Sequence, residues 1–308
     1  MYFKKILGHK NLVRRLQKAS HDPGHAYIFE GEDGMGKGVM VAAFAKILQC
    51  EENIEDKSRQ DACGACLSCR VFESGNHPDI IYVKAEKTRI GVDDVRNQIV
   101  LPMTIKPFRY RYKIFIIAHA ETMTPAAQNA LLKTIEEPAP YGIFLFMATH
   151  VRNFLPTVLS RCVTLKLHPL PDDLVADSLR RAILPEDTIR FCTAFAMGNP
   201  GRAKELAQSE DFAEMHALAQ NIADNMQSHL EAFELYPQLE KRKESIQDML
   251  DMLYMCYRDK LEKSKSIESD LISLDTIAET KQFLYKNGNF QLAIELMLMK
   301  LAGDYVWK

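Results

Sequence analysis

The sequence lacks the features that mark membrane proteins and strongly charged proteins. No apolar run approaches the about 18 residues that a transmembrane helix needs. The formal net charge is only −2 over 308 residues, so the chain as a whole has no charge excess that would attract DNA. The N-terminal stretch, residues 1–7, is too short and too polar for an export signal. We therefore expect a globular cytoplasmic protein of two or three domains.

A second absence lies inside a glycine-rich loop. The segment GEDGMGKG, residues 31–38, follows the apolar run Ala26–Phe29 and precedes a helix-like run, Val39–Gln49. This is the P-loop pattern, in which backbone amides and a lysine bind phosphate. The pattern ends in Ser or Thr, whose hydroxyl binds Mg²⁺, but this chain has Gly38 there. The candidate nucleotide-binding residues are Gly31, Gly34, Gly36, Lys37 and Gly38, and the sequence leaves open whether they bind ATP or ADP.

The acidic residues that hold Mg²⁺ in P-loop ATPases are also missing from their usual place. In those enzymes an Asp follows an apolar strand and helps to hold the metal. Here the corresponding strand, Lys113–Ile117, is followed by Ala118 and His119, and Glu121 lies further on in the turn. Two independent losses of metal-binding groups predict that the chain does not hydrolyse ATP by itself.

The first half of the chain alternates between strand-like and helix-like segments. Its continuous apolar runs are typical of strands buried in a parallel sheet with both faces covered. The runs are Ala26–Phe29, Ile80–Val83, Ile114–Ala118, Ile143–Ala148 and Val163–Leu167. We expect a doubly wound α/β domain over residues 1–167, with the glycine-rich loop at the carboxyl end of an early strand.

Four of the seven cysteines form a cluster with metal-ligand spacing. Cys63, Cys66 and Cys69 are separated by two residues each, and Cys50 ends the helix-like run after the glycine-rich loop. Thiolates at this spacing share one tetrahedral zinc ion. Four cysteines would close the coordination shell, so we expect a structural zinc module over residues 50–69. For Cys162, Cys192 and Cys256, packing in the core is the default interpretation.

Three further positions are candidates for contact with a nucleotide. Ser160-Arg161-Cys162 precedes the fifth strand, and an exposed arginine at such an edge can reach the nucleotide site of a neighbouring subunit. Taken alone, an arginine at a helix end is more often a surface ion-pair partner. Thr149 follows the fourth strand, and Arg202 follows the Gly198–Gly201 segment. A strand-end hydroxyl and a solvated helix charge are the plainer interpretations of these two residues.

One local cluster of positive charge stands out. It consists of Lys106, Arg109, Arg111 and Lys113. Such a cluster is either a basic binding face or ordinary solvated loop charge, and the second interpretation is the commoner one.

The second half of the chain is helical in pattern. Prolines at 169 and 171 mark a boundary, which predicts a small helical domain over residues 168–209 and a C-terminal helical domain over residues 210–308. Apolar residues at three- and four-residue steps predict a helix with one buried face. They are Ile246, Met249, Leu250, Leu253, Tyr254, Tyr257 and Leu261. A last helix over 290–305 is apolar around most of its circumference, which requires cover from this chain or from another subunit.

Four motifs together resemble one family. They are the 31–38 loop, the four clustered cysteines, the string NALLKTIEEP at 129–138 and the triplet at 160–162. This set resembles the AAA+ subunits of the bacterial clamp loader of DNA polymerase III, over about the first two-thirds of the chain. The C-terminal part agrees only in type, as the collar that holds the ring together. The resemblance implies an AAA+ P-loop domain, a helical lid and a helical collar.

Within that family the chain resembles the non-hydrolysing delta-prime type. The motor subunits, gamma and tau, keep the loop Ser/Thr and an acidic pair, whereas this chain has Gly38 and Ala118-His119. The resemblance implies that Arg161, between Ser160 and Cys162, acts in trans on a neighbouring gamma or tau ATP site. It also implies structural zinc, a delta subunit as a second partner, and contact with the sliding clamp and primer-template DNA through the assembled complex.

Two other functions remain open at this stage. The first is an active, gamma-like ATPase, and the absence of metal-binding groups at 38, 118 and 119 speaks against it. The second is a zinc protein that binds DNA without sequence preference, and the near-neutral net charge speaks against it.

Overall fold

The computed structural model describes residues 2–56, 58–226, 228–263 and 267–303. It divides into two compact units, Met1–Glu205 and Leu206–Lys308, and the division falls inside helix α11 (Pro200–Gln208). The finer division at 167/168 and 209/210 stays a prediction. Within the described ranges, no helix has both the length and the apolar character to cross a bilayer.

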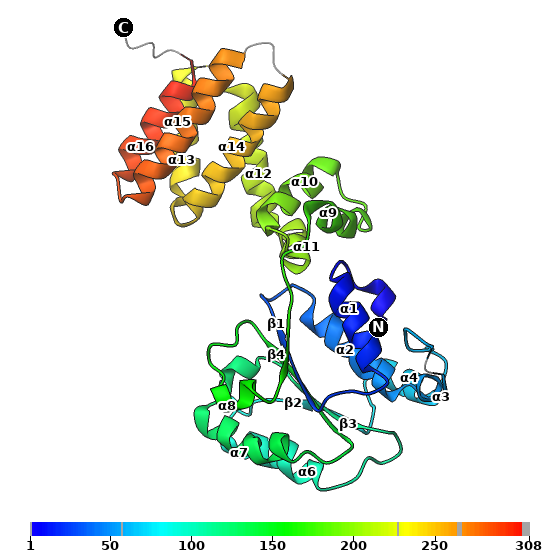
Figure 1. Ribbon diagram of the computed structural model, residues 1–308. Coiled ribbons are helices and arrows are strands. Elements are labelled where there is room, and N and C mark those ends of the chain that lie inside the picture. Colours follow the sequence, from blue (N-terminus) through cyan, green and yellow to red (C-terminus); the bar gives the residue numbers. More distant parts are fainter. Residues whose placement is uncertain (1, 57, 227, 264–266, 304–308) are drawn as a thin grey trace. The chain divides into compact units, whose positions relative to one another are not determined.

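The first unit is built on a five-stranded parallel sheet (Figure 1). The strand order is β2-β3-β4-β1-β5, and every pair of neighbours is parallel. The strands are β1 (Ala26–Glu30), β2 (Ile80–Val83), β3 (Lys113–Ile117), β4 (Gly142–Ala148) and β5 (Val163–Lys166). All five lie where the apolar runs predicted them, with ends that differ by one residue at most.

Helices cover both faces of the sheet (Figure 1). Alternate strand residues point to opposite faces, so Tyr27 and Phe29 join one core cluster and Ala26 and Ile28 join the other. The helices of this unit are α1 (Lys10–Ala19), α2 (Lys37–Gln49), α3 (Glu51–Glu55), α4 (Leu67–Glu73), α5 (Val92–Val95), α6 (Leu101–Met103), α7 (Pro125–Glu136), α8 (Pro156–Leu159), α9 (Asp172–Arg180) and α10 (Glu186–Ala196). Short 3₁₀ turns at Phe3–Lys5 and Ala120–Thr122 and a π-helical turn at Arg96–Val100 complete it.

The second unit is entirely helical among its described residues. It contains α12 (Glu210–Asn225), α13 (His229–Glu240), a 3₁₀ turn (Lys243–Ser245), α14 (Ile246–Lys263), α15 (Ile267–Tyr285) and α16 (Phe290–Leu301). Helix α14 packs against α12 and α15, and α16 packs against α13 and α15. The predicted apolar face of α14 is buried at Met249, Leu250 and Leu253, but Tyr254 is exposed. Met252 faces the core as well, because the buried stripe is wider than the sequence spacing indicated.

Helix α16 is only partly covered by the described residues of its own chain. Ala293, Ile294 and Met297 are buried, whereas Leu292 and Leu296 are exposed. The sequence predicted cover on more than one side of this helix, and these two leucines lie on a side that the described residues leave open. The helix ends at Leu301, before the predicted end at residue 305, and residues 304 and 305 lie outside the described residues.

Candidate functional site

The glycine-rich loop links β1 to α2 at the carboxyl edge of the sheet. Gly34 and Gly36 have φ values of 84° and 90°, a conformation that residues with a Cβ atom rarely adopt. Helix α2 begins at Lys37, and its first intrahelical hydrogen bond runs from the Met40 amide to the Gly36 carbonyl. The amides ahead of Met40 therefore have no intrahelical acceptor, which is the arrangement that binds phosphate in a P-loop.

A cavity of about 480 Å³ opens beside this loop. Its volume lies in the range of small-molecule sites. Residues from the carboxyl ends of three adjacent strands line it, because Gly34–Gly38 follow β1, Ala118 and His119 follow β3, and Thr149 follows β4. The N-terminal residues Ile6 and His9 also line it, and they carried no recognisable signal in the sequence.

Lys37 points into its own loop. The Lys37 ammonium donates to the Gly31 carbonyl at 2.5 Å and to Oδ1 of Asp33 at 2.9 Å. The side chain of Lys37 is 10% exposed and that of Asp33 is 68% exposed. The one cation that a P-loop offers to phosphate is thus paired with a carboxylate of the same loop.

The three positions that hold Mg²⁺ in P-loop ATPases lie at the cavity, as the sequence indicated, and one further acid, Glu121, joins them. Gly38, Ala118 and His119 all line the cavity, and only His119 carries a group that binds metals. Glu121 also lines the cavity, where its Oε1 accepts a hydrogen bond from Thr149 Oγ1 at 3.2 Å. Its Oε2 is buried and has no partner among the described residues. The sequence placed this acid further on in the turn, beyond the usual acidic position, and the tight 3₁₀ turn after β3 brings it to the cavity.

The two weaker nucleotide candidates are placed differently. Thr149 lines the cavity beside Glu121, whereas the described lining residues include Gly201 and Lys204 but not Arg202. The Arg202 amide donates to Oδ1 of Asn199 at 3.1 Å, which fixes the start of α11. The sequence gave no reason to single out Lys204, since it is one of many helix lysines.

Asn199 joins the glycine-rich loop to the segment that follows α10. Its Nδ2 donates to the Asp33 carbonyl at 2.6 Å, and the Gly201 amide donates to the Gly34 carbonyl at 3.0 Å. A Cβ atom on Gly201 would lie 2.3 Å from the Gly34 Cα, so this approach requires glycine. The sequence marked this Asn-Pro-Gly stretch only as the segment before Arg202, whereas in the structure it holds the glycine-rich loop.

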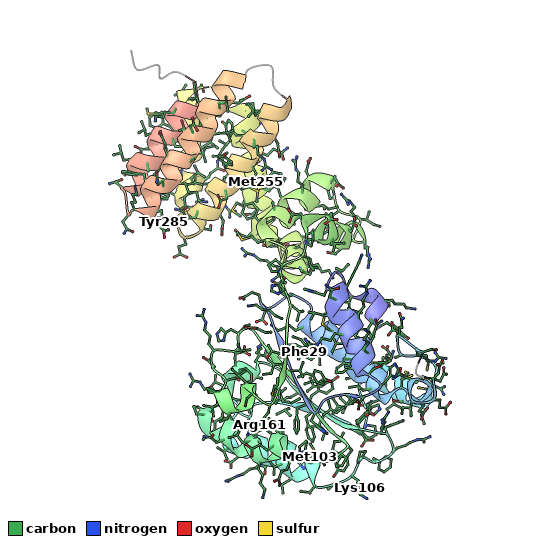
Figure 2. All side chains as sticks on the ribbon, in the orientation of Figure 1. Phe29, Met103, Lys106, Arg161, Met255 and Tyr285 are labelled. Carbon is green, nitrogen blue, oxygen red and sulfur yellow. The ribbon has the colours of Figure 1, made fainter. Side chains whose placement is uncertain are left out.

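Arg161 lies directly after α8 and is accessible at 39% of its side-chain surface. Its guanidinium donates to the Thr157 carbonyl at 2.9 Å and to Ser160 Oγ at 3.1 Å. It also pairs with Glu136 at 2.9 Å. Glu136 belongs to the string at 129–138, so two motifs far apart in sequence meet at this point on the rim of the sheet, where Arg161 is labelled in Figure 2. Burial raises the pKa of the neighbouring Cys162 thiol to about 12, which agrees with a packing role.

A buried glutamine holds the segment that leads to Arg161. Gln128 of α7 donates to the carbonyls of Met123 and Asn153 at 3.2 and 2.8 Å. Its Oε1 accepts the Leu155 amide at 2.7 Å, one residue before α8 begins. The side chain is fully buried, so α7 fixes where α8 and the residues after it lie.

The four clustered cysteines meet beside the carboxyl end of α2. Their sulfur atoms all lie within 4.8 Å of one another, and those of Cys63 and Cys69 are 3.9 Å apart. Sulfurs of a tetrahedral zinc site lie about 3.8 Å apart when each Zn–S bond is about 2.3 Å. The amide of Cys63 donates to the sulfur of Cys50, and the amides of Cys66 and Cys69 donate to the sulfurs three residues earlier. This donor set fits a bound metal ion.

The pKa values of three thiols in the cluster shift in different directions. The hydrogen bond with Cys69 lowers the pKa of Cys50 to about 5, while the same contact raises the pKa of Cys69. Burial raises the pKa of Cys63. Four sulfurs this close cannot all ionise without a compensating cation, because like charges at short range disfavour one another. A divalent ion would supply that compensation.

The four positive charges near the start of β3 do not share one environment. Lys106, Arg109 and Arg111 are exposed, and Lys106 marks this edge of the unit in Figure 2. Lys113 is 6% exposed, and its ammonium donates to the carbonyls of Pro102 and Ile105 at 2.9 and 2.6 Å. Lys113 fits neither a basic binding face nor solvated loop charge, because its side chain turns inward to satisfy the end of α6.

Comparison with known proteins identifies the family. A family model described as "DNA polymerase III, delta subunit" matches residues 8–171, more than half of the chain. The DNA polymerase III subunit delta' of Bacillus subtilis is 30% identical over 263 residues, which cover 84% of this chain and 78% of that protein. The chain belongs to the delta' family of DNA polymerase III subunits.

Two further relatives define the extent of the similarity. DNA polymerase III subunit delta' of Escherichia coli is 31% identical over 217 residues, which cover 68% of this chain and 63% of that protein. Subunit tau/gamma of Haemophilus influenzae is 32% identical over 191 residues, which cover 61% of this chain but only 27% of that protein. The predicted fold class is confirmed in its main parts: an α/β domain with a five-stranded parallel sheet and a glycine-rich loop, added helical parts, and a four-cysteine cluster.

Proposed function

We propose that this delta' family member is a non-hydrolysing subunit of a bacterial clamp loader, which helps to place a sliding clamp on primer-template DNA during replication. Its partners are the gamma or tau subunits and delta, and the clamp and DNA are met through the assembled complex. Kinship with delta' and tau/gamma proteins supports this assignment. The site of action is the bacterial cytoplasm.

We assign to Arg161 the role of an arginine finger that works in trans. One observation carries this assignment: its guanidinium is accessible and its pairing with Glu136 is between two half-exposed groups. Such surface pairs contribute about 0–1 kcal/mol, so a neighbour's phosphate can replace Glu136 at little cost. Ser160 supports the guanidinium through its hydroxyl, and Cys162 packs the segment into the core. An arginine supplied to a transferring phosphoryl group is worth roughly 10³–10⁵ in rate where it has been measured.

The chain's own nucleotide site is proposed to be silent in hydrolysis. Gly38, Ala118 and His119 carry no side-chain oxygen, so both the hydroxyl and the acid from which P-loop ATPases build their Mg²⁺ site are missing from their usual positions. Gly31, Gly34, Gly36 and Lys37 remain as a metal-free cradle for ADP or ATP phosphates. Thr149 lies on the cavity wall, and Arg202 is proposed to approach only when a nucleotide is bound.

The metal of the cysteine cluster is proposed to be zinc in a structural role. Cys50, Cys63, Cys66 and Cys69 supply four sulfurs, which is a closed shell for Zn²⁺ and leaves no open position for catalysis. The measurement is metal content by emission spectrometry of protein purified without chelator. Near one equivalent of zinc is expected, and less than about half an equivalent would reject the site.

The arginine assignment is tested in the reconstituted clamp loader. Arg161→Ala is expected to lower the DNA- and clamp-dependent ATPase rate at least tenfold, and Arg161→Lys is expected to restore little because lysine lacks the planar fork. Arg152→Ala is the matched control, since Arg152 is an exposed arginine nine residues earlier on the same rim segment. A normal rate for Arg161→Ala in a complex that assembles normally would refute the assignment.

A further inference from the structure

The glycine-rich loop carries its own negative charge. Glu32 and Asp33 stand between Gly31 and Gly34, in the part of the loop that surrounds phosphate in nucleotide-binding proteins. Asp33 is the residue whose carboxylate contacts the Lys37 ammonium, at 2.9 Å. No such contact is present for Glu32 among the described residues, although it lies next to Asp33 in the chain and also carries a carboxylate.

Two of the three donors of the Lys37 ammonium are already engaged in this arrangement. A lysine ammonium has three donors and no acceptor. One donor goes to the Gly31 carbonyl and a second to Asp33, so both a neutral and a charged acceptor are already present. A phosphate oxygen that entered the loop would compete for the position that the Asp33 carboxylate holds.

The backbone of Asp33 is held by hydrogen bonds, while its side chain is exposed to solvent. The Asn199 side chain binds the Asp33 carbonyl, and the next peptide is held by the bond from Gly201 to Gly34. The side chain of Asp33 is 68% exposed, and because these anchors are made by the backbone, neutralising the carboxylate leaves the loop anchored. The same exposure allows the carboxylate to swing into water when a stronger anion displaces it.

We propose that Asp33 is a built-in substitute for phosphate, which occupies Lys37 and keeps polyphosphate ligands out of the loop. The ligand class that it excludes is nucleoside di- and triphosphates, together with base-free polyphosphates. The inference rests on the proposed function in one respect, namely that the 31–38 loop retains the shape of a phosphate cradle. It adds a second reason for the silence of this site, one that is independent of the missing metal ligands.

The expected effect is a gain of affinity when the carboxylate is neutralised. An exposed ion pair is weak, so releasing Lys37 accounts for a few-fold change. Removing a negative charge next to the incoming phosphate adds a further factor, and together they give roughly tenfold tighter binding. The gain must need Lys37, because that side chain is what the carboxylate occupies.

The test measures binding of ADP and of inorganic tripolyphosphate to the full chain by isothermal titration calorimetry. The buffer contains neither magnesium nor chelator, since a chelator would strip the cysteine cluster. The variants are Asp33→Asn, the double variant Asp33→Asn/Lys37→Ala, and Glu32→Gln as the matched control. Asp33→Asn is expected to bind both probes about tenfold more tightly than the unaltered chain, and the double variant is expected to lose that gain. Glu32→Gln is expected to change affinity less than threefold.

Two results would overturn the proposal. One is equal binding, or equal absence of binding, by Asp33→Asn and the unaltered chain. The other is an equal gain from Glu32→Gln, which would indicate a general charge effect. The arginine assignment is tested by a different assay, the ATPase rate of the reconstituted complex. Comparing Asp33→Asn with Arg161→Ala in that assay distinguishes failure of one proposal from failure of the other.

Discussion

Gln128 offers the sharpest test of how the fold positions Arg161. Replacement by methionine keeps the volume of the side chain but removes its amide. The Leu155 amide then loses its acceptor, and the carbonyls of Met123 and Asn153 each lose a donor. None of these bonds can be replaced by water without opening the core, because Gln128 is fully buried.

The size of the effect follows from those three bonds. A buried donor left without a partner costs about 1–3 kcal/mol, and a carbonyl that loses one of its partners costs less. We expect Gln128→Met to lower the free energy of unfolding by roughly 2–4 kcal/mol. For a unit of this size each kcal/mol lowers the melting temperature by about 2–4 °C, so a decrease of roughly 5–10 °C is expected by scanning calorimetry.

The same substitution separates positioning from stability. Because Leu155 immediately precedes α8, its release loosens the segment that carries Arg161. The ATPase rate of the reconstituted complex is therefore expected to fall at temperatures where the variant is still folded. Asn129→Ala, an exposed neighbour on α7, is the control and should change neither property. A Gln128→Met protein with the same melting temperature as the unaltered chain would refute this account of α7.

Three further predictions concern other parts of the first unit. Cys69→Ser is expected to lose bound metal and to melt at a lower temperature, whereas Cys192→Ser, at a buried cysteine outside the cluster, should keep its metal; metal retained by Cys69→Ser would contradict the site. Asp79→Ala removes a buried carboxylate that accepts the amides of Phe108, Arg109 and Tyr110, so these amides should exchange with solvent at least tenfold faster, and unchanged exchange would count against the loop anchor. Burial lowers the pKa of His77, so its imidazole should titrate below 6.5 by NMR; the unfolded state then binds the proton more readily, and stability should fall as the pH drops below about 6.5. A His77 midpoint at or above 6.5 would contradict the buried neutral ring.

The sheet could be predicted from the sequence because each strand is a continuous apolar run. A strand buried on both faces needs apolar residues at every position, and β3 and β4 satisfy this almost completely. The cysteine cluster could also be predicted from the sequence, since three of its four ligands lie close together along the chain and only Cys50 is more distant. The glycine-rich loop could be recognised because positive φ values at Gly34 and Gly36 require glycine.

Long-range polar contacts could not be predicted in this way. Lys113 looks like a surface charge in the sequence, and only the end of α6 shows why it turns inward. The pairing of Asp33 with Lys37 depends on how the loop closes, and that closure depends on Asn199, more than 160 residues away. Glu121 lies a few residues beyond the usual acidic position in the sequence, yet it still reaches the cavity because a 3₁₀ turn shortens the path from β3.

The central claim is that this chain leaves ATP hydrolysis to its neighbours, and steady-state turnover by the isolated chain measures it directly. With saturating ATP and Mg²⁺, the account predicts a rate no higher than that of the Lys37→Ala variant. A magnesium-dependent rate that disappears on Lys37→Ala would show a working site in this subunit and would contradict the account.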